Sequence, residues 1–156
     1  MTRDQAIAKS FEYFDSGEFL SDLKTLIKIP TESQTKGGLK HCEKYLREAI
    51  SPVFKKMGFG TKMFANPVSG FGPVLLATRI EDPSLPTILG YGHGDVILGM
   101  EERWADSRSP WIIEVDGERV YGRGTADNKS QHWINIIALK HTLETRGALG
   151  FNAKFV

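Results

Sequence analysis

The chain alternates between segments with helical periodicity and segments rich in strand-forming residues. In residues 17–30, GEFLSDLKTLIKIP, apolar side chains recur at i, i+3 and i+4, which is typical of an amphipathic helix. Residues 39–59, LKHCEKYLREAISPVFKKMGF, repeat this pattern, with Pro52 as an expected kink. A third helical pattern runs over residues 128–145, where apolar side chains wrap widely around the helix axis. These three segments are predicted helices.

Four further segments favour strands because they are short and rich in β-branched and aromatic residues. They are 61–65 (TKMFA), 73–80 (PVLLATRI), 87–92 (TILGYG) and 149–156 (LGFNAKFV). The second and third are apolar enough for the middle of a sheet that is covered on both faces. The fourth is expected at an open edge of the sheet. Helices on both sides of one sheet predict an α/β fold that is one domain or part of one.

Composition and charge exclude several classes of protein. The 156 residues include 20 basic and 19 acidic side chains spread along the chain, which indicates no nucleic-acid partner. No run approaches the ~20 apolar residues of a membrane span, and the charged start has no leader-like apolar core. The single cysteine, Cys42, cannot form an internal disulfide, which agrees with a reducing compartment. We therefore expect a soluble, cytoplasmic chain with no membrane partner.

The first stretch with candidate chemistry is residues 88–99, ILGYGHGDVILG. His93 falls just beyond the carboxyl end of a strand, where open α/β sheets place ligands and catalytic groups. Glycines at 90, 92 and 94 allow sharp turning and close approach of the backbone to another group. Asp95 is suited to accept a hydrogen bond from the second ring nitrogen of His93. The alternative is a glycine-rich turn with an incidental histidine and a turn-stabilising aspartate.

A second stretch, residues 120–131 with the sequence VYGRGTADNKSQ, combines a glycine bend with Asp127 at the start of the long helix. One alternative is that Asp127 is an ordinary N-cap. Another is phosphate binding by a glycine-rich loop that enters a helix, but the spacing of a Walker loop fails. Asp127 lies 127 − 93 = 34 residues after His93, so only the fold can bring the two together.

Taken in order, three blocks of the sequence resemble a known family. GHGDV at 92–96, SPW at 109–111 and DGERVYGRGTADNKSQ at 116–131 are similar to signatures of the dizinc aminoacylase, carnosinase, succinyl-diaminopimelate desuccinylase and glutamate carboxypeptidase family. The resemblance extends to LKTLIKIPTES near the start. It implies that His93 is a zinc ligand, Asp95 a catalytic residue that orients it, and Asp127 the carboxylate that bridges two zinc ions. Asn128 would follow a cis peptide bond.

The same resemblance implies a fold and a reaction. The expected fold is a three-layer zinc-exopeptidase-like sheet flanked by helices. Two Zn²⁺ ions roughly 3.5–4 Å apart share one carboxylate and activate a water for attack on an amide carbonyl. A glutamate elsewhere in the family is the general base. The implied protein is a metallopeptidase, either an exopeptidase such as a carboxypeptidase or an aminoacylase. Its substrates would be small peptides or acylated amino acids, and the complete enzyme could be a homodimer.

The sequence departs from the family pattern at three of the matched positions. Ser130 replaces the usual Gly, and Ser109 and Trp111 replace the usual Asp and Phe. Residues 1–156 are expected to be the N-terminal part of a zinc-peptidase catalytic domain, without the dimerisation domain and the C-terminal catalytic part. Such a fragment would be inactive alone. The alternative is a non-catalytic remnant that acts as a binding or interaction module. The remaining candidates, His41, His132, His141, Glu101 and Glu102, are not expected to be ligands.

Overall fold

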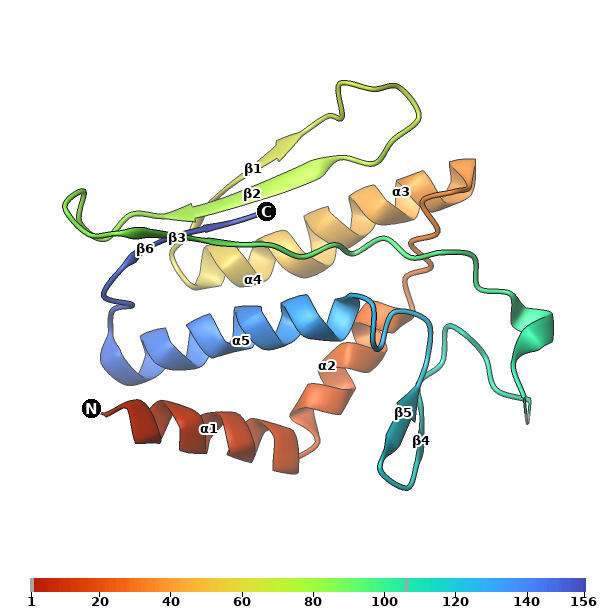
Figure 1. The fold of residues 1–156 in the computed structure, drawn as a ribbon, viewed down its shortest axis with the longest axis horizontal. Coiled ribbons are helices and arrows are strands. Elements are labelled where there is room, and N and C mark those ends of the chain that lie inside the picture. Colours follow the sequence, from red (N-terminus) through yellow and green to blue (C-terminus); the bar gives the residue numbers. More distant parts are fainter. Residues whose placement is uncertain (1, 106) are drawn as a thin grey trace.

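A computed structural model describes residues 2–105 and 107–156, which form a four-stranded mixed sheet packed on helices (Figure 1). The α-helices are α1 (Arg3–Asp15), α2 (Glu18–Ile27), α3 (Lys36–Lys44), α4 (Ser51–Lys56) and α5 (Lys129–Arg146). The π-helix η1 (Tyr45–Ile50) joins α3 to α4, and a 3-10 helix, η2 (Glu101–Arg103), follows the third strand. The strands are β1 (Gly60–Phe64), β2 (Val74–Arg79), β3 (Thr87–Gly90), β4 (Glu114–Asp116), β5 (Arg119–Tyr121) and β6 (Asn152–Phe155).

The main sheet has the strand order β1-β2-β6-β3, and β4 pairs with β5 in a separate hairpin. Strands β1, β2 and β6 pair antiparallel, whereas β3 runs parallel to β6. The interior position expected for β2 is confirmed. The interior position expected for β3 is wrong, because β3 forms one edge of the sheet. The edge position expected for β6 is also wrong, since β6 lies between β2 and β3.

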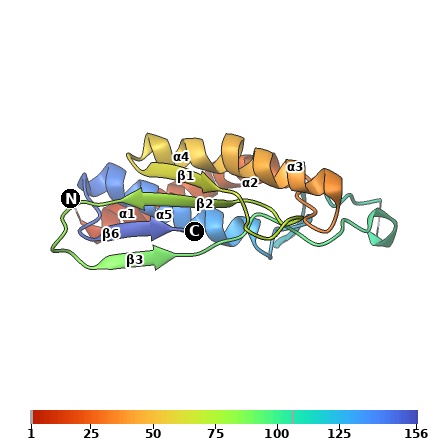
Figure 2. The ribbon, with the colours of Figure 1, turned by 90° about the horizontal axis from the view of Figure 1, so that it is seen from above.

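All α-helices of the described residues lie on one face of the main sheet. Figure 1 shows α3, α4 and α5 directly beneath the sheet, with α1 and α2 below α5. Figure 2, seen from above, shows the opposite face of the strands without a covering helix. The α/β class is confirmed, but the expectation that helices cover both faces is not met within these residues.

The core forms where one face of the sheet meets this helical layer. On β2, Leu75 and Ala77 are buried and alternate with more exposed neighbours, as a strand with one covered face requires. They belong to one cluster with Phe54 of α4, Ile136 of α5 and Phe155 of β6. Full burial of each large apolar side chain contributes about 1.5–3 kcal/mol. This cluster fixes α5, and therefore the start of α5, against the sheet.

The second predicted helix is divided into three parts. The α-helical hydrogen bonding of α3 gives way to the π-helix η1, and α4 then begins at Ser51 with Pro52 in its first turn. The backbone is already helical before Pro52, and the wider π-helical turn of η1 accommodates the missing N–H of the proline. The irregularity expected at Pro52 is thus placed in the π-helical segment just before it.

Within residues 2–105 and 107–156, no helix is both long enough and apolar enough to cross a membrane.

Candidate metal site

His93 stands just beyond the carboxyl end of the parallel pair β3 and β6. After β3, the backbone N–H of Gly92 donates to the carbonyl of Val156 at 2.9 Å, so regular pairing continues up to the residue before His93. The chain then leaves the sheet toward the start of α5. This is the position at which open α/β sheets bind ligands, as the sequence predicted.

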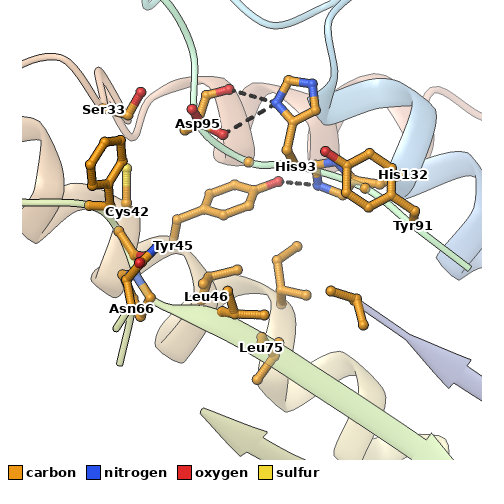
Figure 3. A pocket seen from close by; sticks show the side chains of 18 of the residues that line it. Ser33, Cys42, Tyr45, Leu46, Asn66, Leu75, Tyr91, His93, Asp95 and His132 are labelled. Carbon is orange, nitrogen blue, oxygen red and sulfur yellow. Dashed lines mark hydrogen bonds and ion pairs between the residues drawn. The ribbon is translucent and has the colours of Figure 1, made fainter. Parts of the chain in front are cut away.

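Asp127 and Asp95 lie on either side of the His93 ring. The Nε2 atom of His93 is 2.9 Å from Oδ1 of Asp127, and Nδ1 is 3.3 Å from Oδ1 of Asp95. Nδ1 also lies 3.1 Å from the carbonyl oxygen of Asp95, and Figure 3 shows both Asp95 oxygens facing this nitrogen. The geometric prediction that His93 faces Asp127 with Asp95 behind it is confirmed. The ligand roles themselves stay a prediction.

The spacing of the two donors fits one shared cation. Two ligand atoms of a tetrahedral zinc ion are about 3.3 Å apart when each metal–ligand bond is about 2.0–2.1 Å. The 2.9 Å between Nε2 and Oδ1 therefore needs only a small opening. The Asp127 side chain is 83 % exposed, so its second oxygen is open to solvent and free to approach another ion. The residues present fit a divalent metal, although they supply only two ligands.

The corner that carries Asp127 is tied directly to the His93 backbone. The Asp127–Asn128 peptide bond is cis, as the resemblance implied. Asn128 is the N-cap residue of α5, but its side chain makes no capping bond. Its Oδ1 instead accepts the backbone N–H of His93 at 3.2 Å. One amide side chain thus joins the two segments that carry the candidate ligands.

Beneath this corner lies a buried pair that the sequence analysis missed. Tyr45 of η1 and His132 of α5 are 1 % and 4 % exposed, and the Tyr45 hydroxyl is 2.6 Å from His132 Nε2 (Figure 3). His132 Nδ1 lies 3.3 Å from Oδ1 of Asn128. Burial lowers the pKa of His132 to about 4, so its ring is neutral at pH 7. The helical spacing of the histidines excluded a chelating pair but carried no signal for a tyrosine 87 residues away.

The glycines of the His93 turn are required by close approach rather than by backbone conformation. A Cβ on Gly92 would lie 2.3 Å from Cβ of His132, and one on Gly94 would lie 2.3 Å from Cε1 of Tyr45. The glycines with a positive φ lie elsewhere, for example Gly122 and Gly124 in the bend before Asp127. The expected close approach is confirmed, and its partners are the buried tyrosine and histidine.

The segment after α2 fastens the other side of the His93 turn. The Thr31 hydroxyl donates to the carbonyl of Gly94, and the Val96 N–H donates to the Thr31 carbonyl at 2.9 Å. Further along, the Gly99 N–H donates to Oε1 of Glu32 at 2.7 Å. The motif LKTLIKIPTES therefore has a structural task, since its final residues hold the strand exit that carries His93.

Lys129, two residues after Asp127, anchors the start of α5 to the end of α2. Its side chain is fully buried, and Nζ donates to the carbonyls of Leu26 at 3.0 Å and Ile29 at 2.7 Å. The ammonium also lies 4.9 Å from the centre of the Tyr45 ring. Burial lowers the pKa of Lys129 to about 7. The Lys-Ser pair considered for phosphate binding is thus turned inward, because the Ser130 hydroxyl donates to the carbonyl of Thr125.

A cavity of about 500 Å³ opens beside the candidate site. Its lining includes His93, Asp95 and His132 at one end and apolar side chains of η1, α4 and β2 at the other (Figure 3). Cys42 also lines the cavity, and burial raises the pKa of its thiol to about 11. A thiol with so high a pKa is a poor nucleophile at pH 7, as expected.

The other candidate ligands have partners outside the site. His41 Nδ1 is 3.1 Å from the carbonyl of Pro30, and His141 Nδ1 is 3.0 Å from the Ser10 hydroxyl. Glu101 accepts the indole N–H of Trp111 at 3.1 Å. Among residues 2–105 and 107–156, no group of three or more His, Cys, Asp or Glu side chains is arranged to hold a metal ion.

With this geometry in view, comparison with known proteins finds similar dipeptidases and metallopeptidases. The chain is 29 % identical over 163 residues to the Beta-Ala-His dipeptidase of Mus musculus, covering 96 % of this chain and 32 % of the relative. Its structure matches human carnosine dipeptidase 1 with a TM-score of 0.78 and 26 % identity, over 95 % of this chain and 33 % of that chain. No family model matches the chain.

A third match is a solved metallopeptidase of the M20 family. The M20 family metallo-carboxypeptidase Sso-CP2 from Sulfolobus solfataricus matches with a TM-score of 0.73 and 28 % identity, covering 88 % of this chain and 30 % of that chain. Homologues of this chain are therefore dipeptidases, and its structural neighbours are M20 metallopeptidases, which confirms the resemblance read from the three motifs. The chain spans about a third of the length of these relatives.

Proposed function

We propose that this chain supplies part of the metal centre of a metal-dependent hydrolase of amide bonds, and that its own span is part of a zinc-peptidase catalytic domain. The observation that carries the proposal is the approach of His93 Nε2 to Asp127 Oδ1 at 2.9 Å, with Asp95 against the other ring nitrogen. The relatives support it, because they are metallopeptidases matched over most of this chain.

Each of the three residues has a separate task. His93 and Asp127 would hold the divalent ion, zinc being the choice most consistent with an imidazole and a carboxylate. A metal held there would supply a Lewis acid that polarises the amide carbonyl of a substrate. Asp95 would keep the proton of His93 on Nδ1, so that Nε2 presents its lone pair to the metal. The exposed second oxygen of Asp127 would serve a second zinc ion.

The proposed substrates are small peptides or acylated amino acids. A dipeptide is favoured because one relative is a Beta-Ala-His dipeptidase and a structural neighbour is carnosine dipeptidase 1. The homodimeric state implied by the family resemblance and the cytoplasmic location expected from the lone cysteine remain predictions.

The test measures zinc binding by the 156-residue chain with isothermal titration calorimetry at pH 7. We expect weak binding that His93→Ala and Asp127→Asn each weaken about 10-fold or more, because each removes one of two ligands. His41→Ala is the matched control, since His41 bonds the Pro30 carbonyl away from the site. We expect this chain alone to hydrolyse neither dipeptides nor acyl-amino acids, because the described residues bring only two ligands together. Equal zinc affinity in the wild type, His93→Ala and Asp127→Asn would contradict the proposal.

A further inference from the structure

The hydrogen bonds around His132 have one consistent direction. Oδ1 of Asn128 accepts the His93 N–H at 3.2 Å, which fixes the orientation of the Asn128 amide. His132 Nδ1 faces the same oxygen at 3.3 Å, so Nδ1 must carry the ring proton. Nε2 of the neutral ring is then an acceptor, and the Tyr45 hydroxyl donates to it at 2.6 Å. Each hydrogen bond of this series fixes which atom donates and which accepts in the next.

The same two side chains form the floor of the His93 turn. The rings of Tyr45 and His132 meet edge to face, with centroids 5.8 Å apart and an interplanar angle of 87°. Gly92 lies directly on His132 and Gly94 directly on Tyr45, so close that neither could carry a Cβ without displacement. The residues before and after His93 therefore rest on the pair, independently of the hydrogen bonds.

Asn128 is also held from a third side. Its Nδ2 donates to Oε1 of Gln131 at 2.6 Å, which agrees with the amide orientation required by His93 and His132. The Asn128 side chain thus has little freedom to rotate as long as His132 keeps its proton on Nδ1. A half-buried polar group that is partnered on three sides favours one arrangement of the elements that it joins.

From this arrangement we propose that Tyr45 and His132 are positioning residues: by orienting the Asn128 amide and supporting the glycines, they hold the His93 backbone at the distance from Asp127 that a shared metal requires. Neither side chain is a candidate metal ligand, and both lie beneath the turn that carries His93. The inference rests on the proposed function for the ligand roles of His93 and Asp127, whereas the positioning of the His93 backbone can be measured without any metal.

The decisive experiment is amide hydrogen exchange of the metal-free chain by NMR. Tyr45→Phe removes one hydroxyl and keeps the ring that Gly94 packs on. We expect the His93 amide to exchange at least about 10-fold faster, and the His132 ring nitrogens to lose their single-tautomer pattern. His132→Leu should have the same effect on the His93 amide. His132→Asn, which places an amide N–H near the position of Nδ1, should restore its protection.

Two controls separate positioning from general loosening. Ser10→Ala also deletes a hydroxyl bonded to a histidine of α5, because Ser10 Oγ is 3.0 Å from His141 Nδ1, and it should leave the His93 amide unchanged. The Val96 amide, bonded to the Thr31 carbonyl, is the internal reference for the same turn. Unchanged exchange at His93 overturns the proposal, and so does equal acceleration at His93 and Val96.

A cobalt titration then links the network to the site. With Co²⁺ as the probe, we expect Tyr45→Phe to weaken binding about 10-fold and to alter the visible spectrum, while Ser10→Ala changes neither. Faster His93 exchange with unaltered Co²⁺ affinity in Tyr45→Phe would contradict the link to the metal. If the wild-type chain binds no Co²⁺, the proposed function fails, and the exchange data still decide whether the pair positions His93.

Discussion

At the scale of single residues, side-chain volume sets the sequence of the turn that carries His93. Gly94 has no side chain because the Tyr45 ring occupies the space where one would lie. Tyr45 in turn is placed by its hydroxyl contact with His132, at 2.6 Å, and by burial among the core residues. A substitution in the turn therefore acts on the buried pair as well as on the candidate ligand.

We expect Gly94→Ala to lower the free energy of unfolding by about 2–3 kcal/mol, because the added Cβ would lie 2.3 Å from Tyr45 Cε1 in a packed interior. Gly37→Ala is the matched control. A Cβ there meets nothing within 4 Å, and alanine within α3 should stabilise by about 0.5–1 kcal/mol. Urea denaturation measures both variants. Similar effects of the two substitutions would show that the turn does not rest on Tyr45.

The low pKa of His132 predicts a specific loss of stability in acid. In the folded chain burial lowers this pKa to about 4, whereas in the unfolded chain it is about 6.5. Between these values only the unfolded state binds the proton, so stability falls as the pH falls from about 6.5 to 4. We expect His132 to account for a loss on the order of 2 kcal/mol between pH 7 and pH 4.5.

Urea denaturation at several pH values checks this, with His132→Leu as the comparison. The variant is less stable at pH 7 but should lose less on acidification, because the other titrating groups are common to both chains. Parallel pH profiles of the wild type and His132→Leu would contradict a buried neutral imidazole.

The sequence predicted His93, Asp95 and Asp127 as candidate site residues, because motifs record residue types at fixed local spacing. It did not identify Tyr45 and His132, because their pairing joins η1 to α5 across 87 residues and leaves no local pattern. The need for glycine at 92 and 94 was visible, whereas the side chains that impose it were not.

At the scale of elements, Lys129 connects the start of α5 to the end of α2. The Lys129 ammonium donates to the carbonyl of Leu26 in the last turn of α2 and to that of Ile29 just beyond it. These bonds add to the backbone N–H groups that the two carbonyls already accept. This contact sets where α5 begins, and with it the position of Asp127 two residues earlier.

We expect Lys129→Met to lower the free energy of unfolding by about 3 kcal/mol, since both hydrogen bonds of a fully buried side chain are lost. Lys140→Met, on the exposed side of α5 where Lys140 is 3.8 Å from Glu144, should change it by less than about 0.5 kcal/mol. Chemical denaturation checks both variants. A Lys129→Met chain within about 1 kcal/mol of the wild type would contradict this anchoring role.

Periodicity predicted the elements with a clear pattern, namely α2, the α3–α4 segment, α5 and the four strands of the main sheet. It missed α1, whose Phe11 and Phe14 are exposed, and the β4–β5 hairpin of two three-residue strands. Strand order was not predictable, because the placement of β6 between β2 and β3 depends on pairing over about 70 residues.

At the scale of the whole molecule, the β3 edge of the sheet exposes apolar side chains close to the candidate site. Leu89 of β3 is 67 % exposed, and Ile88 and Tyr91 beside it are also exposed. An open edge strand with exposed apolar side chains is a template for pairing with another chain.

We therefore expect the 156-residue chain to self-associate at high concentration through β3. Leu89→Lys should shift the equilibrium toward monomer, because a charged side chain on an edge strand opposes such pairing. Ile112→Lys, at a similarly exposed site outside the sheet, is the control and should have no effect. Sedimentation velocity measures the association. Equal association of both variants and the wild type would place the contact elsewhere.

The proposed metal site begins with His93 and Asp127. The most direct measurement is a zinc titration of the chain labelled with ¹⁵N, in which the ring nitrogens of all four histidines are observed together by NMR. We expect the first zinc added to shift the His93 Nε2 resonance and to leave the other three histidines, His41, His132 and His141, unchanged. Asp127→Asn should diminish the shift. A first response at any other histidine, or none at His93, would contradict the proposed site.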